Sequence, residues 1–320
     1  MTSFREAARN GHRQEIQPNI REASCRKRGK NSLQRLVKAC NRYGAIYLGL
    51  ILTLAISSGG HLAVHAADAS IKLQSGDLDR TCLLHVPPLY DGKRSLPLVI
   101  VIAPSESGKY MVEKTGFSDL GDKYGFIVVY PDANARNQRW NSMFGKVPGG
   151  EGVLPDEVDD IAFFRSLVGS LHATHHVDLS RVYVCGLSAG AYMTYRVAVE
   201  LSDVVAAVGI VCGSMGIKSV DGQPVSTVFP EPIAPVSIFQ ISGRQDTNVK
   251  FEGGQFPKCL AKSTPDCVQF FARANACSTN AVVNVDAEHG FTQTVYSKGR
   301  DGTEVQLMVL DRACPKRGSF

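Results

Sequence analysis

Short apolar runs alternate with amphipathic stretches between about residues 70 and 310. Residues 96–102 (LPLVIVI) and 126–130 (FIVVY) are apolar almost throughout, which is typical of strands buried on both faces of a parallel sheet. Strands are expected at residues 70–73, 80–86, 96–102, 126–130, 182–185, 205–212, 235–241, 281–285, 292–297 and 304–310, and helices at residues 112–124, 161–172, 191–201 and 268–276. This alternation predicts an α/β fold with a mostly parallel, doubly wound sheet and helices on both faces.

The first 66 residues differ from the rest in composition. Residues 1–43 carry 11 Lys and Arg against 3 Asp and Glu, and residues 44–66 carry no charged side chain of these four types. Residues 45–56 are apolar apart from Thr53, a run that is short for a membrane span and typical of a signal peptide. We predict a basic leader and signal peptide over residues 1–66, cleaved after Ala66, and one secreted domain over residues 67–320. An uncleaved membrane anchor is the alternative.

The charge of residues 67–320 argues against a nucleic-acid partner, and the spacing of their cysteines and histidines argues against a zinc site. The whole chain has a formal net charge of +5, but the excess lies in the leader, so nothing indicates a nucleic-acid surface. No Cys/His set has metal-ligand spacing, so a zinc site is not expected. Cys185 and Cys212 lie in apolar runs and are expected to be inert core thiols. Cys259, Cys267 and Cys277 lie close together, and two of them are candidates for a disulfide.

A Gly-x-Ser-x-Gly segment stands at the centre of the pattern. Gly186 to Gly190 (GLSAG) follows an apolar strand and precedes a helix, the context in which α/β folds present a nucleophilic serine. The glycines allow close passage of the backbone, and the helix N-terminus favours negative charge. We predict that Ser188 lies in a strained or tight strand-to-helix turn, with its Oγ facing a pocket at the carboxyl edge of the sheet. The alternative is a glycine-rich turn without chemistry.

Several further segments agree with this motif. VDDIAFFRSLV, VDLSRVYVCGLSAGAYMTY and PVSIFQISGRQD occur in this order, and TGFSDLGDKYGFIVVYPDA and RWN precede them. Together they resemble the secreted poly(3-hydroxybutyrate) depolymerase and feruloyl or acetylxylan esterase group of the α/β-hydrolases over about residues 70–310. The resemblance implies hydrolysis of carboxylic esters through an acyl-enzyme on the serine, and it implies neither a metal nor an organic cofactor. The substrates implied are polyhydroxyalkanoate polyester or feruloyl and acetyl esters of plant polysaccharide.

The resemblance also implies roles for particular residues. Ser188 falls on the nucleophile, and Asp246 falls on the carboxylate that orients a catalytic histidine. Because Asp246 follows the apolar strand at residues 235–241, it is expected at the same sheet edge as Ser188, with room for an imidazole between them. A simple turn residue is the alternative for Asp246. Trp140 and Asn141 are candidates for substrate binding; Trp140 either stacks on a sugar or aromatic ring or belongs to the core.

Two departures from the family pattern bear on activity. Ala103-Pro104 replaces a His-Gly pair in the loop that normally donates an N–H to the oxyanion. Because Pro104 has no N–H, Ser105 is the expected donor, together with Ala189.

The second departure concerns the base. The family's Gly-Gly-His-x-Trp-Pro stretch is absent after the last strand, where residues 311–320 contain no histidine. The histidines elsewhere are expected to be structural or solvated. An alternative function is therefore a catalytically impaired or inactive remnant of the family, truncated by a frameshift near Asp311 or Arg312.

Overall fold

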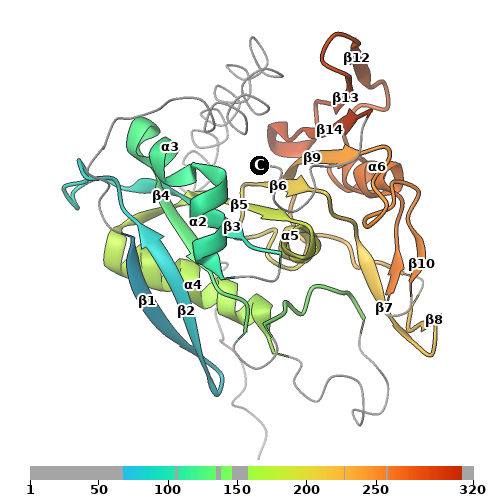
Figure 1. Ribbon diagram of the computed structural model, residues 1–320. Coiled ribbons are helices and arrows are strands. Elements are labelled where there is room, and N and C mark those ends of the chain that lie inside the picture. The colour runs from blue at the N-terminus through green and yellow to red at the C-terminus, as the bar shows by residue number, and fades with distance from the viewer. Residues whose placement is uncertain are drawn as a thin grey trace, which may run out of the picture.

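A large, mostly parallel sheet organises the protein. The computed structural model describes residues 68–104, 107–134, 138–145, 158–226, 228–256 and 259–311. Within these ranges, ten strands form one sheet in the order β1-β2-β4-β3-β5-β6-β9-β14-β13-β12 (Figure 1). Their bounds are β1 Ala69–Ser75, β2 Leu78–His85, β3 Leu96–Ile102, β4 Ile127–Pro131, β5 Val177–Leu187, β6 Ala207–Val211, β9 Ser237–Gly243, β12 Val282–Asp286, β13 Phe291–Tyr296 and β14 Val305–Leu310.

The six strands from β4 to β14 run parallel, and the strands outside them pair antiparallel. The predicted α/β architecture is therefore confirmed.

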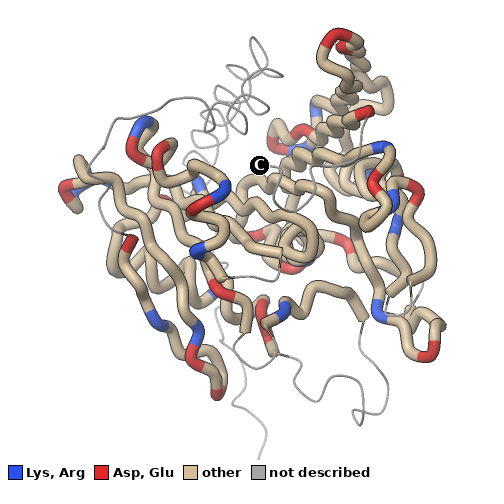
Figure 2. Tube along the Cα trace, in the orientation of Figure 1, with Lys and Arg blue, Asp and Glu red and all other residues tan. Residues whose placement is uncertain are grey.

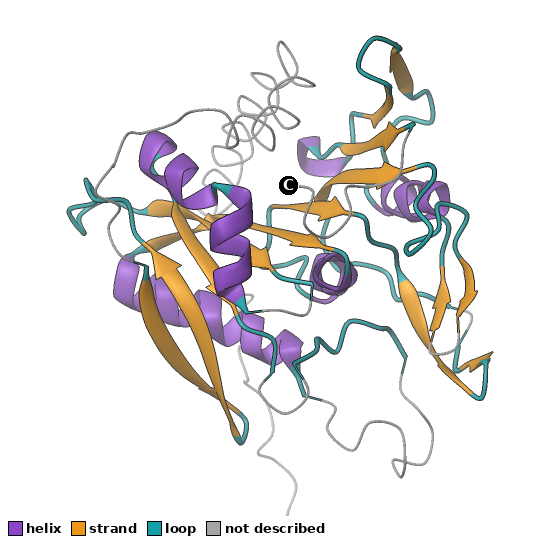
Figure 3. Cartoon of the chain, viewed as in Figure 1, coloured by secondary structure: helices purple, strands orange, loops and turns teal. Residues whose placement is uncertain are grey.

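Helices cover both faces of this sheet (Figure 3). The helices α4 (Asp160–His175), α5 (Ala189–Glu200) and α6 (Thr264–Ala274) pack on one face, where they bury the larger hydrophobic cluster. The helices α2 (Gly108–Thr115) and α3 (Phe117–Tyr124) cover β3 and β4 on the other face. Asp159 caps α4 by accepting from the N–H of Ala162 at 2.9 Å, which fixes where that helix begins.

One predicted helix is two helices in the structure. The pattern over residues 112–124 predicted a continuous element, but the chain breaks at Gly116, which has φ 60° and ends α2 before α3 begins. A residue at this left-handed conformation cannot continue a helix, and glycine adopts it without a Cβ penalty. The prediction of one helix was wrong because the apolar spacing continues across the break.

A second, smaller sheet was not predicted. The strands β7 (Gly216–Val220), β8 (Gln223–Pro224), β10 (Gly254–Phe256) and β11 (Cys259–Ala261) pair in the order β10-β11-β7-β8. This sheet is attached beyond β6, and Phe144 joins it through a bridge to Ile217. Strands of two to five residues are too short to show an alternating pattern, so the sequence carried little signal for them.

The predicted leader, residues 1–66, lies outside the described ranges, so its cleavage remains a prediction. Among the helices of the described ranges, none combines the length and apolarity needed to cross a bilayer. Lysine and arginine positions are interspersed with aspartate and glutamate positions along the described chain (Figure 2).

Candidate active site

Ser188 forms the junction between β5 and α5. It follows Leu187, the last residue of β5, and precedes Ala189, the first residue of α5, with φ 54° and ψ −116°. A positive φ is uncommon for a residue with a side chain and is typical of strain at functional sites. The predicted strained strand-to-helix turn is therefore confirmed.

The two glycines of the motif are required by close backbone contacts. A Cβ on Gly190 would lie 2.3 Å from the carbonyl oxygen of Ile102, at the end of β3. A Cβ on Gly186 would lie 2.3 Å from the carbonyl oxygen of Gly190 itself. Because both neighbours are backbone atoms, neither contact can be relieved by a side-chain rotation. The glycines thus let β3, β5 and the start of α5 meet tightly beneath Ser188.

Backbone hydrogen bonds hold the Ser188 turn in place. The Ser188 N–H donates to the carbonyl of Val211 in β6 at 3.0 Å, and the Ser188 carbonyl accepts from Tyr192 at 3.1 Å. Ala189 occupies the first position of α5, where a backbone N–H has no acceptor within its own helix. That N–H and the positive end of the helix dipole are suited to an oxyanion beside Ser188.

Asp246 lies at the same edge of the sheet as Ser188. The ends of three parallel strands are in register, with Leu187 opposite Val211 and Val211 opposite Ile241. Ser188 directly follows the first of these residues, and Asp246 lies five residues after the last. Two strand spacings separate β5 from β9, which is roughly 10 Å. The structure thus brings both residues to the carboxyl edge, as predicted.

The carboxylate of Asp246 also organises its own loop. Its Oδ1 accepts from the N–H groups of Asn248 at 2.8 Å and Val249 at 2.9 Å. Burial raises the pKa of the Tyr192 phenol, and the negative charge of Asp246 acts in the same direction. Asp246 therefore has the turn role that was expected as an alternative to the catalytic one. Both of these hydrogen bonds use Oδ1, and neither uses Oδ2.

Trp140 belongs to the core. Its side chain is only 6% exposed, its ring stacks on Phe164 with centroids 5.5 Å apart, and Arg80 lies 5.5 Å from the ring centroid. The indole N–H donates to the carbonyl of Ala103 at 2.8 Å. Of the two alternatives for Trp140, the structure therefore shows the core role, because the ring is enclosed by protein and does not offer a face to a substrate.

Asn141 has structural partners as well. Its backbone N–H donates to Asp160 Oδ2 at 2.7 Å, and its side-chain amide donates to the carbonyl of Val158 at 3.2 Å. Trp140 and Asn141 thus hold the end of β3 and the start of α4 together. Substrate binding by Asn141 stays a prediction.

The loop after β3 is only partly described. Ala103 and Pro104 follow β3, but Ser105, the expected second oxyanion donor, lies outside the described residues. Asp132 fixes the far end of the loop, since its Oδ1 accepts from the Gly108 N–H at 2.6 Å.

We expect Trp140→Phe to destabilise the protein by about 1–3 kcal/mol, because it leaves the buried Ala103 carbonyl without its donor. Urea unfolding measures this. Tyr90→Phe, which removes a hydrogen bond from a half-buried hydroxyl to the His175 carbonyl, is the control and should cost less. Equal stability of Trp140→Phe and the wild type would show that the indole hydrogen bond contributes nothing.

Each histidine of the described chain lies away from Ser188. His85 is buried between Asp68 and Asp122, at 3.0 and 2.8 Å, and His172 contacts the carbonyl of Val177. His175 and His176 immediately precede β5. All four of these histidines therefore lie at the amino edge of the sheet.

His289 alone of the described histidines lies at the carboxyl edge. It occupies the turn between β12 and β13, paired with Asp286 at 3.0 Å. β14, β9 and β6 lie between β13 and β5, so roughly 19 Å of sheet separates it from the Ser188 strand. No catalytic histidine is assigned within the described residues.

The cysteine predictions need two corrections. Cys259, Cys267 and Cys277 are free, so the expected disulfide among them is not formed. Cys212, expected to be an inert thiol, is disulfide-bonded. Cys185 is free, and burial raises its pKa to about 12, which agrees with an inert thiol. An apolar run identifies burial but does not reveal whether a cysteine is oxidised, so the sequence alone did not separate these cases.

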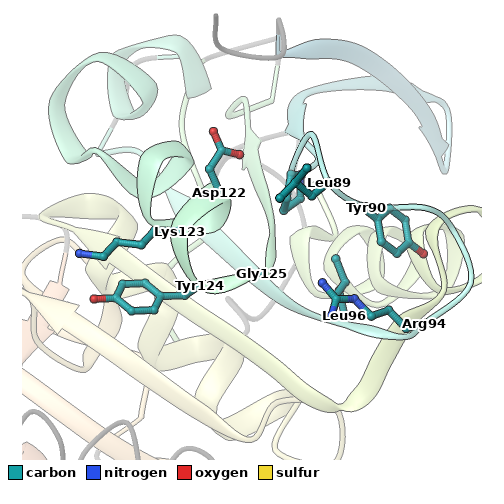
Figure 4. A pocket seen from close by; sticks show the side chains of 9 residues that line it. Leu89, Tyr90, Arg94, Leu96, Asp122, Lys123, Tyr124 and Gly125 are labelled. Carbon is teal, nitrogen blue, oxygen red and sulfur yellow. The ribbon is translucent and has the colours of Figure 1, made fainter. Parts of the chain in front are cut away.

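A cavity of about 240 Å³ lies elsewhere in the fold (Figure 4). It is lined by Tyr90, Arg94, Leu96, Asp122 and Gly125, among others. Leu96 begins β3 and Gly125 lies two residues before the start of β4, so the cavity is at the amino edge, opposite Ser188. It is therefore separate from the Ser188 turn, and the predicted pocket in front of Ser188 stays a prediction.

Residues 81–223 match the family described as esterase PHB depolymerase. This part of the chain is similar to that family. The matched segment extends from β2 into β8 and contains the Ser188 turn, whereas Asp246 lies beyond it.

Curated relatives point to the same esterase family. The poly(3-hydroxyalkanoate) depolymerase C of Paucimonas lemoignei is 34% identical over 122 residues, which are 37% of this chain and 28% of that protein. The putative esterase NocK of Nocardia uniformis subsp. tsuyamanensis is 28% identical over 201 residues, 59% of this chain and 53% of that protein. The chain thus spans between about a quarter and about half of the length of these relatives.

A solved structure agrees on the fold. The acetyl xylan esterase from Aspergillus awamori superposes on 76% of this chain and 92% of its own, with a TM-score of 0.51 and 14% sequence identity. At this identity the likeness concerns the fold, which is the α/β-hydrolase fold.

Proposed function

We propose that the protein is a secreted serine ester hydrolase in which Ser188 forms an acyl-enzyme. The observation that carries the proposal is the strained Ser188 turn, held between β5 and the N-terminus of α5 at the carboxyl edge of the sheet. Such a turn presents a hydroxyl to solvent and to the helix dipole at once. The family match over this segment supports the same function.

The proposed reaction has two stages. The Ser188 Oγ gives up its proton to a base and attacks the carbonyl carbon of a carboxylic ester, and the tetrahedral oxyanion is stabilised by the Ala189 N–H and a donor from the loop after β3. The alcohol leaves with that proton, and an acyl group stays on Ser188. Water then releases the acyl group as the acid and returns a proton to the Ser188 oxygen. Asp246 is proposed as the carboxylate that stabilises positive charge on the base. The proposal assigns no histidine to the role of base.

The substrate class follows from the relatives. A depolymerase of poly(3-hydroxyalkanoate) and acetylxylan esterases are among the proteins that the chain resembles. We therefore place the substrate among esters of hydroxyalkanoate polymers and among feruloyl or acetyl esters of polysaccharides. Export, with cleavage after Ala66, is part of the proposal and places the enzyme outside the cytoplasm, where such polymers occur.

A second candidate is a catalytically impaired member of the family. The observation that favours it is the placement of the histidines, since four of those in the described chain lie at the amino edge and His289 is bound to Asp286. A serine hydroxyl without a base is a weak nucleophile. This candidate keeps the fold and the Ser188 turn but has little turnover.

A panel of esters separates the two candidates. Purified protein is incubated with p-nitrophenyl acetate, methyl ferulate, acetylated xylan and oligomers of 3-hydroxybutyrate, and the released acid or phenol is followed. The proposed function predicts sustained turnover of at least one ester, with each active site releasing many products. A single stoichiometric release of phenol without further turnover would identify the impaired candidate instead.

A further inference from the structure

A buried glutamine lies between the segments that carry the two proposed catalytic residues. Gln240 is the fourth residue of β9, and its side chain is 0% exposed. Through Ile210 it is in register with Gly186, two residues before Ser188. A buried primary amide carries two donors and an acceptor that need partners inside the protein. The partners of Gln240 therefore show which segments its side chain joins.

Three segments supply the partners of this amide. Its Nε2 donates to the carbonyl of Gly213, just beyond β6, at 3.1 Å and to the Oγ of Ser242, near the end of β9, at 3.0 Å. Its Oε1 accepts from the hydroxyl of Tyr195 on α5. Because a backbone carbonyl only accepts, the contact with Gly213 fixes the NH₂ group on that side and leaves Oε1 facing Tyr195. The amide is thus satisfied in a single orientation.

Two of these partners lead to the Ser188 turn. Gly213 packs directly on the first turn of α5, since a Cβ on Gly213 would lie 2.4 Å from the Cβ of Ala191. The Ala191 N–H in turn donates to the Ser188 carbonyl at 2.9 Å. Tyr195 lies on the next turn of α5 and is fully buried. The amide therefore holds the first two turns of the helix that begins after Ser188.

The third partner leads to the Asp246 loop. Ser242 is buried, and the residue after it, Gly243, is the last of β9. The Gly243 carbonyl accepts from the Asp246 N–H at 3.3 Å. One side chain, that of Gln240, is therefore joined by short chains of contacts to the backbone on both sides of the proposed site.

We propose that Gln240 is a positioning residue, whose amide fixes the separation between the Ser188 turn and the Asp246 loop. The inference rests on the proposed function, because both segments are taken to act on the same ester. Gln240 is enclosed by protein, so it acts through these segments and not on the ester itself. A misplacement of about 1 Å can cost a reaction about 10²-fold in rate, so a residue that sets this separation also sets the rate.

Gln240→Met tests this role in the kinetics, because methionine has nearly the same length but no N–H group. It should lower kcat for p-nitrophenyl acetate by roughly 10²-fold and leave KM nearly unchanged, since the affected groups act in the transition state. Gln240→Glu is the conservative variant. Its carboxyl, while neutral, still donates to the Gly213 carbonyl and accepts from Tyr195, so its kcat relative to wild type should be higher at low pH and fall as the carboxyl ionises.

Asn275→Leu is the matched control, because it removes a buried amide from the other end of the same strand. The Asn275 side chain is 0% exposed, accepts from the Val236 N–H at 3.1 Å and donates to the Val236 carbonyl at 2.7 Å. Val236 immediately precedes β9, at the amino edge. Both variants should lower the Tm, but Asn275→Leu should keep the wild-type kcat. Equal losses of kcat in Asn275→Leu and Gln240→Met, or a wild-type kcat in Gln240→Met, would overturn the inference.

Amide hydrogen exchange, followed by NMR, tests the same role without any turnover. In Gln240→Met, and in the milder variant Tyr195→Phe, the amides that hold the two segments should exchange faster than in the wild type. These are the amide of Tyr192, which donates to the Ser188 carbonyl, and that of Val249, which donates to Asp246. The amide of Gly125, at the amino edge, should keep its wild-type rate.

The two measurements distinguish failure of this inference from failure of the proposed function. A wild-type protein that hydrolyses no ester would refute the proposed function, and faster exchange at Tyr192 and Val249 in Gln240→Met would still support the positioning role. Unchanged exchange at both amides would contradict that role, even in an active esterase.

Discussion

Ser188→Ala is expected to lower the rate of ester hydrolysis by about 10⁴-fold or more, where 10⁴ is the low end of the range found when one member of a catalytic triad is removed. The alanine methyl group cannot attack the ester carbonyl, so no acyl-enzyme forms. Only binding and the oxyanion donors would then remain to accelerate attack by water. The measurement is the steady-state rate with p-nitrophenyl acetate under the same conditions for both proteins.

The matched control for Ser188→Ala is Ser180→Ala. Ser180 lies on the same strand, β5, but near its beginning, and its hydroxyl donates to Asp178 at 2.6 Å. This variant should keep the wild-type rate, because Ser180 is far along the strand from the carboxyl edge. If Ser188→Ala and Ser180→Ala hydrolyse the ester equally well, then Ser188 does not carry the reaction, and the impaired candidate describes the protein better.

Asp160→Asn is expected to cause the largest loss of stability. Arg80 and Asp160 are 1% and 0% exposed and are joined at 2.7 Å. Removal of one charge from such a pair leaves the other buried without a counter-charge and costs about 3–5 kcal/mol. Phe163 lies 4.0 Å from the guanidinium and gives it little compensation for the lost carboxylate. The Tm should fall by roughly 10–15 °C, as measured by calorimetry.

An exposed ion pair provides the control for Asp160→Asn. Arg165 and Asp203 also meet at 2.8 Å, but their side chains are 49% and 37% exposed. Asp203→Asn should therefore cost less than about 1 kcal/mol. The double variant Arg80→Met/Asp160→Leu should recover much of the loss, because it removes both charges. A Tm for Asp160→Asn within 2 °C of that for Asp203→Asn would show that the buried pair does not stabilise the fold as argued.

The Asp160 carboxylate also connects the core to the proposed site. Its second oxygen accepts from Asn141, the residue next to Trp140, and Trp140 in turn holds the carbonyl of Ala103 at the end of β3. Because Trp140 is the only tryptophan of the chain, the intrinsic tryptophan fluorescence reports on the surroundings of this one side chain. The emission of Asp160→Asn should shift to longer wavelength as the indole becomes more exposed.

Much of the fold could be predicted from the sequence because the central strands are continuous apolar runs. Residues 96–102 were predicted with the bounds that β3 shows, and the strand, Gly-x-Ser-x-Gly and helix order correctly placed Ser188 in a strained turn. These signals are local, since each depends on a few consecutive side chains. The carboxyl-edge position of Asp246 followed from the parallel sheet, which is a topological rule rather than a local one.

The features that the sequence missed depend on contacts between distant residues. Trp140 is fixed in the core by Ala103, Phe164 and Arg80, and nothing in its neighbouring residues distinguished that role from stacking on a substrate. The break at Gly116 depends on one backbone angle.

The reactivity of Ser188 is tested most directly by an alkyl fluorophosphonate, which bonds only to an activated serine. Full-length protein is treated with the reagent, and the modified residue is located by mass spectrometry of the tryptic digest. The account predicts one equivalent of phosphonate per chain, attached to Ser188, and no incorporation in Ser188→Ala. Wild-type protein that stays unlabelled, or that carries the label on another residue, would contradict the claim that Ser188 is the nucleophile of this site.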